Sequence, residues 1–106
     1  MSETHVVALS GSLREESYTR LATARALQGV EAAGGRGELL DLREYDLPPF
    51  NADNDGPGDS QRLVDRVGAS DAIILASPMY HGSYSGVLKN ALDYCGFDEF
   101  EGKTVG

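Results

Sequence analysis

The sequence lacks several features that would point to particular classes of protein. It has no tryptophan and one cysteine, Cys95, which excludes an internal disulfide framework. Its two histidines have no cysteine or carboxylate at zinc-ligand spacing, so we expect no metal site. No apolar run approaches the roughly 20 residues that span a bilayer, and residues 1–5 lack the basic and apolar regions of a signal peptide. We therefore expect a cytoplasmic protein with no membrane partner.

Positive charge is also scarce. Nine Lys and Arg residues stand against 17 Asp and Glu, which gives a formal net charge of −8. Nucleic-acid binding needs a stripe of positive charge, so we expect no nucleic-acid partner. Two interpretations of the acidic composition remain open. The chain is an ordinary acidic protein, or it is adapted to high cytoplasmic salt, which screens the repulsion between like charges.

Apolar runs predict three strands, over residues 5–9, 38–42 and 71–77. The first and third runs have almost no polar alternation, which is typical of strands buried on both faces of a parallel sheet. Between and after the strands, helical spacing predicts helices from residue 17 to the glycines at 34–35, over residues 60–69, and from about residue 85. Residues 103–106 are predicted to begin a fourth strand.

Apolar spacing also predicts which helical residues are buried. The first helix is expected to face the sheet with a row of mostly small residues, the second with a short apolar row, and the third with a row that makes Cys95 a core residue. These rows are Tyr18, Ala22, Ala26 and Val30; Leu63, Val64 and Val67; and Leu88, Ala91, Leu92 and Cys95.

The alternation of strands and helices predicts an α/β fold with a parallel sheet, right-handed crossovers and helices on both faces. A length of 106 residues allows one domain, and we expect it to be the N-terminal part of a longer protein. Two polar loops, residues 10–17 and 78–83, follow the first and third strands. With a strand order of 2-1-3 they are neighbours, and they form two walls of one ligand site.

The first wall places hydroxyl groups and the Arg14 guanidinium at the start of a helix. The free N–H groups and the dipole of a helix N-terminus favour an anion, which suits a phosphate monoester. The alternative is simple capping of the helix by Ser17, with Glu15 and Glu16 near the positive end of the dipole.

The second wall combines a proline, aromatic rings and small residues, a mixture that suits a planar heterocycle. The alternative is that Tyr80 and Tyr84 pack the loop and that His81 is a solvated loop residue. The occurrence of both walls at strand ends favours a mononucleotide site.

Two segments resemble the NADPH-dependent FMN reductase family, which includes quinone reductases, azoreductases and flavin reductases. They are residues 11–14 with Ser17, and the longer run of residues 77–93; the similarity extends from residue 5 to the last residue. The resemblance implies a flavodoxin-like doubly wound sheet of order 2-1-3-4-5, here with three strands and the start of the fourth. Residues 1–106 are then the N-terminal part of a single FMN-binding domain.

The same resemblance implies which residues bind the cofactor. Those implied to hold the FMN phosphate are Ser12, Arg14, Ser17, Tyr18 and Thr19, and those implied to line the isoalloxazine are Pro78, Met79, Tyr80, His81 and Ser83. Relatives commonly carry Asn at position 19, Glu at position 79 and Asn at position 81.

The activity implied is hydride transfer from NADPH or NADH to bound FMN, followed by electron delivery to a small-molecule acceptor such as a flavin or a quinone. FMN carries this chemistry, so no catalytic side chain is expected. The resemblance also implies a homodimer or larger homo-oligomer for the full-length protein. Two alternatives remain: a flavodoxin-like electron carrier that does not oxidise NAD(P)H, or an inactive fragment.

The two interpretations of the acidic composition predict different responses to salt. If the chain is adapted to high salt, added potassium chloride screens the repulsion among its carboxylates and raises its melting temperature. Thermal melts across a potassium chloride series measure this. A flat or falling melting temperature would leave the ordinary acidic protein as the explanation.

Overall fold

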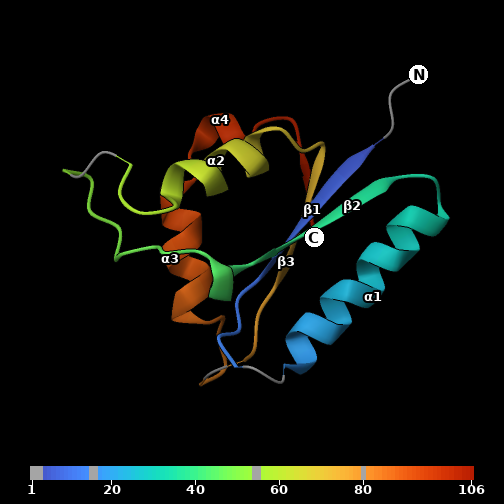
Figure 1. Cartoon of the computed structure of the whole chain (residues 1–106), viewed down its shortest axis with the longest axis horizontal. Helices are drawn as coiled ribbons and strands as arrows, with labels where there is room; N and C mark the ends of the chain where they lie inside the picture. Colours follow the sequence, from blue (N-terminus) through green and yellow to red (C-terminus); the bar gives the residue numbers. More distant parts are fainter. Residues whose placement is uncertain (1–3, 15–16, 54–55, 80) are drawn as a thin grey trace.

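The computed structural model describes residues 4–14, 17–53, 56–79 and 81–106. Within these ranges the chain forms a parallel sheet of four strands in the order β2-β1-β3-β4. Figure 1 shows α1 on one face of the sheet and α2, α3 and α4 on the other. The elements in chain order are β1 His5–Ser10, α1 Tyr18–Ala32, β2 Arg36–Asp41, η1 Leu42–Glu44 (a short 3-10 helix), α2 Ser60–Gly68, β3 Ala72–Ala76, α3 Gly86–Tyr94, α4 Phe97–Phe100 and β4 Thr104–Val105.

The strand order confirms the predicted arrangement of the first three strands and the start of a fourth. In the register of the sheet, Ser10 at the end of β1 lies opposite Asp41 of β2 and Ala76 of β3. The three strands therefore end at the same level, and the loops that follow them share one edge. This edge is where the sequence predicts the ligand site.

The larger core lies between the sheet and the helices α2 and α3. Leu63 and Val67 of α2 and Leu88 and Ala91 of α3 pack there against the central strand, as predicted. Cys95 contacts the same core, which confirms its prediction as a packing residue. Burial raises the pKa of the Cys95 thiol to about 11, so at neutral pH it is protonated and a poor nucleophile.

Most of the face of α1 that contacts the sheet is not the predicted one, although Val30 of the predicted row does pack against the core there. Tyr18 is 88% exposed, and Ala22 and Ala26 are also exposed, whereas Thr23 and Leu27 are the buried residues of the helix. The hydroxyl of Thr23 donates to the carbonyl of Thr19, 2.7 Å away, so its burial leaves no unpaired polar group.

The small residues that let this helix approach the sheet belong to the strands. A Cβ at Gly37 of β2 would lie 3.0 Å from a methyl carbon of Leu27, and Ala8 of β1 packs in the same cluster. The sequence pattern of small residues along α1 therefore indicated the wrong face. Among the described residues, no helix is long and apolar enough to cross a membrane.

The loop after η1 is attached to α3. The side chain of Asn90 accepts a hydrogen bond from the backbone N–H of Phe50 and donates to the carbonyls of Leu47 and Pro48. The Phe50 ring packs edge-on against Tyr94, with 5.2 Å between the ring centroids. Helix α3 therefore holds the first part of the long loop as well as one side of the core.

Substitutions of the two leucines of α1 test which face of the helix packs against the sheet. Leu27 is 6% exposed and Leu21 is 64% exposed. We expect Leu27→Ala to lower the free energy of unfolding by about 2–4 kcal/mol, because it leaves a cavity against the sheet. The matched variant Leu21→Ala should change it by less than about 0.5 kcal/mol. Urea unfolding measures both, and equal losses would contradict this packing.

Candidate functional site

The loops after β1 and β3 are joined by hydrogen bonds at the shared edge of the sheet. The N–H of Gly11 donates to the carbonyl of Ala76, 2.8 Å away, and the carbonyl of Gly11 accepts from the Ser85 hydroxyl, also at 2.8 Å. A Cβ at position 11 would lie 2.9 Å from both the Ser85 Oγ and the Leu88 Cβ. This close approach requires glycine.

Two serine hydroxyl groups fix the ends of the loop that follows β3. Ser85 is the N-cap of α3, and its Oγ accepts from the N–H of Leu88 at 3.1 Å. Its own N–H donates to Ser77 Oγ at 2.7 Å, and the Ser77 hydroxyl donates to the carbonyl of Pro78. The ends of the loop are thus fixed beside the first loop.

Three buried hydroxyl groups lie between the end of β1 and the start of α1. Ser10, Ser12 and Ser17 are 0%, 2% and 7% exposed. Ser17 caps the helix, because its Oγ accepts from the N–H of Arg20 at 3.1 Å, and Ser12 Oγ accepts from the N–H of Arg14 at 3.3 Å. In both contacts the serine oxygen is the acceptor, which leaves the hydroxyl proton available to a ligand.

The hydroxyl of Ser10 has no hydrogen-bond partner within the described part of the chain. Side chains alternate along a strand, so Ser10 shares the α1 face with Val6 and Ala8, near the first turn of the helix. A buried hydroxyl without a partner costs free energy unless a ligand or water completes it. Together with the helix N-terminus, this polar group fits the phosphate of a mononucleotide. Helix capping by Ser17, the alternative interpretation, is also observed and is compatible with it.

Arginine residues lie around the same loop. The side chain of Arg14 is exposed, while its carbonyl accepts hydrogen bonds from Arg20 Nη2 at 2.7 Å and from Arg43 Nη1 at 3.3 Å. Arg20 Nε in turn donates to Asp41 Oδ2 at 2.8 Å. The guanidinium groups of Arg20 and Arg43 and the Asp41 carboxylate therefore form one network of contacts with the backbone of this loop.

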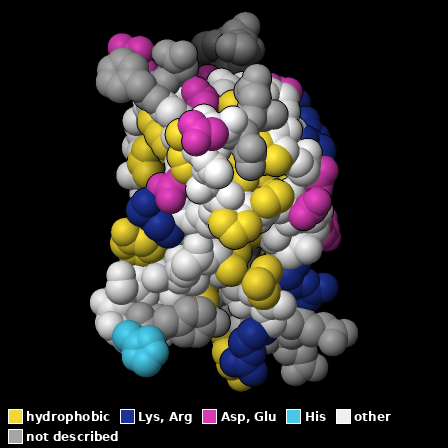
Figure 2. All heavy atoms as spheres, turned by 90° about the vertical axis from the view of Figure 1, so that its left-hand side faces the viewer, with side chains coloured by type: hydrophobic (Ala, Val, Ile, Leu, Met, Phe, Trp, Pro, Cys, Tyr) yellow, Lys and Arg dark blue, Asp and Glu magenta, His cyan; other side chains and the backbone are white. Residues whose placement is uncertain are grey.

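A hollow of about 770 Å³ lies between the second loop and α3. It brings together three of the predicted ring-binding residues, Pro78, Met79 and Ser83. Much of its lining is apolar, including Leu75, Leu88 and Leu92. Figure 2 shows hydrophobic side chains gathered on the side of the molecule where α3 lies. Met79 is 79% exposed, so a flat ligand at this loop has apolar surface to contact.

The remaining predicted residues are placed as follows. Tyr18 is exposed on the first turn of α1, and Thr19 beside it is half-buried. His81 is exposed and has a φ of 53°, in the left-handed region, and Gly82 follows with a φ of 77°. Tyr80, Glu15 and Glu16 lie outside the described residues.

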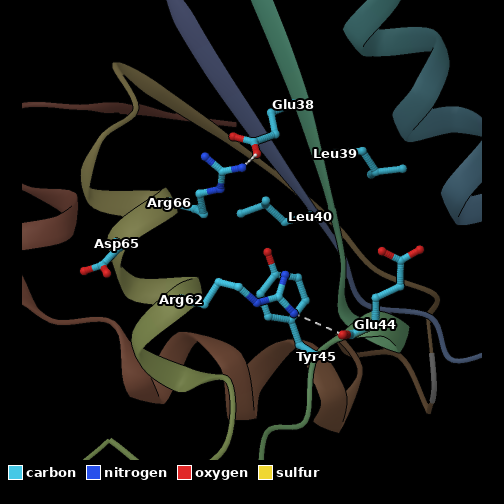
Figure 3. A pocket seen from close by; sticks show the side chains of 8 residues that line it. All are labelled: Glu38, Leu39, Leu40, Glu44, Tyr45, Arg62, Asp65 and Arg66. Atoms are coloured by element: carbon cyan, nitrogen blue, oxygen red, sulfur yellow. Dashed lines mark hydrogen bonds and ion pairs between the residues drawn. The ribbon is translucent and has the colours of Figure 1, made fainter.

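A second hollow, of about 620 Å³, lies at the outer edge of the sheet between β2, η1 and α2. Figure 3 shows Arg66 turned toward Glu38 and Arg62 lying over the Tyr45 ring, while Asp65 points away from them. The Arg62 guanidinium lies 3.9 Å from the centroid of the Tyr45 ring, and Arg66 forms an ion pair with Glu38 at 3.0 Å. Burial raises the pKa of the Tyr45 hydroxyl. These contacts attach α2 to the edge strand and leave few polar groups for a ligand.

Four residues that shape the site were not among those predicted to bind the ligand: Ser10, Arg20, Asp41 and Ser85. Two of them carried a local signal, because Ser85 precedes a helical pattern as an N-cap does and Ser10 ends the first strand. The contact between Arg20 and Asp41 joins residues 21 positions apart and has no local signature.

Comparisons with known proteins agree with this geometry. The family model for NADPH-dependent FMN reductase matches residues 4–106. An FMN-dependent NADPH-azoreductase of Staphylococcus aureus is 33% identical over 102 residues, which cover 91% of this chain and 54% of that protein. The chain thus spans about half the length of such relatives.

Solved structures of oxidoreductases have a similar fold. An NADH:FMN oxidoreductase superposes with a TM-score of 0.84 at 28% identity, over 96% of this chain and 55% of that one. The NAD(P)H:(acceptor) oxidoreductase of Paracoccus denitrificans has a TM-score of 0.74 at 36% identity, over 96% of this chain and 58% of that one. The flavodoxin-like fold predicted from the sequence is confirmed, and the chain belongs to the NADPH-dependent FMN reductase family.

Proposed function

We propose that this chain binds FMN, with the phosphate at the N-terminus of α1. The observation that carries the proposal is the presence of three buried hydroxyls, those of Ser10, Ser12 and Ser17, in the same loop as the exposed side chain of Arg14. Hydroxyl donors, a guanidinium and a helix dipole together favour a dianion. Tyr18 and Thr19, on the first turn of the helix, complete the proposed phosphate site.

The isoalloxazine is proposed to lie against the second loop, over Pro78, Met79, Tyr80, His81 and Ser83. The hydrogen bonds of Gly11 to Ala76 and Ser85 support this, because they hold the second loop beside the phosphate loop. The apolar lining of the adjoining hollow supports it as well. Met79 presents a neutral thioether where relatives commonly carry a carboxylate, so its contact with a ring is apolar.

The protein is proposed to oxidise NADPH or NADH and to reduce a small-molecule acceptor such as a flavin, a quinone or an azo compound. FMN, when bound, supplies the hydride and electron transfer. The residues of this chain bind the phosphate, orient the ring and cover one side of it with apolar groups. No general acid or base is required of them. The names of the similar proteins, an azoreductase and two oxidoreductases, support this class of reaction.

Residues 1–106 are proposed to be the N-terminal part of one FMN-binding domain, since they match about half the length of their relatives. A homodimer or larger homo-oligomer is proposed for the full-length protein. The exposed apolar side chains near the second loop and α3, namely Phe50, Met79 and Tyr84, offer surface for such an association.

Arg14 gives the sharpest test of the phosphate site. We expect Arg14→Ala to weaken FMN binding by about ten- to a hundredfold, the strength of one charged hydrogen bond, and to leave the fold intact. Quenching of FMN fluorescence measures the affinity. The matched control is Arg36→Ala, an exposed arginine at the other end of β2, which should bind FMN as the unmodified chain does. Unchanged affinity in Arg14→Ala would place the phosphate elsewhere.

Steady-state consumption of NADPH with added FMN separates the reductase from its alternatives. A reductase is expected to oxidise NADPH. When different electron acceptors are added in turn, its rate of NADPH oxidation should be lower with the acceptors that it reduces poorly. Flavin absorbance in the purified protein without turnover would instead indicate an electron carrier. A colourless protein that does not quench FMN fluorescence would indicate an inactive fragment.

A further inference from the structure

The best-buried ion pair near the site joins helix α1 to strand β2. Arg20 Nε donates to Asp41 Oδ2 at 2.8 Å, and the two side chains are 20% and 10% exposed. Charges removed from water to this degree require good geometry to persist. Asp41 Oδ1 is also used, because it accepts from the N–H of Arg43 at 3.1 Å. Both carboxylate oxygens are thus occupied, which fixes the position of Asp41.

The other end of the Arg20 guanidinium reaches the proposed phosphate loop. Its Nη2 donates to the carbonyl of Arg14 at 2.7 Å, six residues earlier in the chain. The N–H of Arg14 is held as well, by Ser12 Oγ at 3.3 Å. Both backbone polar groups of Arg14 are therefore engaged, one by a serine of the loop and the other by a guanidinium anchored on β2.

The direction of that carbonyl matters for an anion site. A carbonyl oxygen carries partial negative charge, so one that turned toward a phosphate would repel it, while N–H groups attract it. A carbonyl bonded to Arg20 is held toward the β2 side of the loop. The planar fork of arginine can bond a carboxylate and a carbonyl at once, which the single ammonium of lysine cannot do in the same geometry.

We propose that Arg20, held by Asp41, is a positioning residue for the FMN phosphate and acts through the backbone of Arg14. This inference rests on the proposed function. It assigns Arg20 no contact with the cofactor. It attributes part of the selectivity for a phosphorylated flavin to an ion pair lying on the far side of the loop.

Selectivity between FMN and riboflavin tests it, because the two ligands share the ring and differ in the phosphate. In the full chain, Arg20→Lys keeps a charge beside Asp41 and loses the fork. We expect this variant to bind FMN about tenfold more weakly, with riboflavin affinity changed by less than about twofold. Flavin fluorescence titrations measure both. Arg25→Lys, the same exchange at an exposed position of the same helix, should leave both affinities unchanged.

A second variant keeps the test decisive if the first disturbs folding. Asp41→Asn removes the charge that anchors Arg20 and should lower the preference for FMN over riboflavin in the same direction. If the ion pair has a merely structural role, both variants should lose affinity for FMN and riboflavin equally. That result, or an unchanged preference for FMN in both variants, would contradict the positioning role of Arg20 and leave the proposed phosphate site standing. If the unmodified chain binds FMN no better than riboflavin, that result contradicts the proposed phosphate site and this inference as well.

Discussion

The carbonyl of Gly11 and the buried hydroxyl of Ser85 bring two distant parts of the chain into contact, and the site depends on that contact. One residue belongs to the loop after β1 and the other caps α3, 74 positions later. Parallel strands place their loops at a common edge, but only a residue without a Cβ lets these two loops approach so closely. Each loop is then supported by the other.

The proposed binding of an anion by an acidic protein raises a question of local charge. The formal net charge of −8 repels a phosphate at long range, yet salt screens that repulsion beyond about 8–10 Å. Guanidinium groups lie close to the proposed phosphate loop. The backbone of Arg14 attracts the guanidinium groups of Arg20 and Arg43, and the helix N-terminus adds its dipole. The Asp41 carboxylate, on the neighbouring strand, is bonded to Arg20.

The strand order was expected from the family resemblance, whereas local patterns in the sequence predicted the strands, the capping of α1 by Ser17 and the apolar rows of α2 and α3. The locally predicted features depend on spacing within a few residues, and the structure confirms them together with the strand order. The buried face of α1 was mispredicted because Thr23 satisfies its own hydroxyl and the small residues lie on the strands. Contacts such as that of Arg20 with Asp41 depend on the fold as a whole, so spacing along the chain does not reveal them. The proposed cofactor residues came from motif resemblance and remain predictions.

The left-handed backbone at His81 limits which side chains this position can carry. Only a few residue types other than glycine adopt a positive φ readily, and asparagine, aspartate and histidine lead them. Histidine therefore tolerates a conformation that would strain most other side chains. A β-branched side chain at position 81 would strain this turn of the main chain whatever ligand lies beside it.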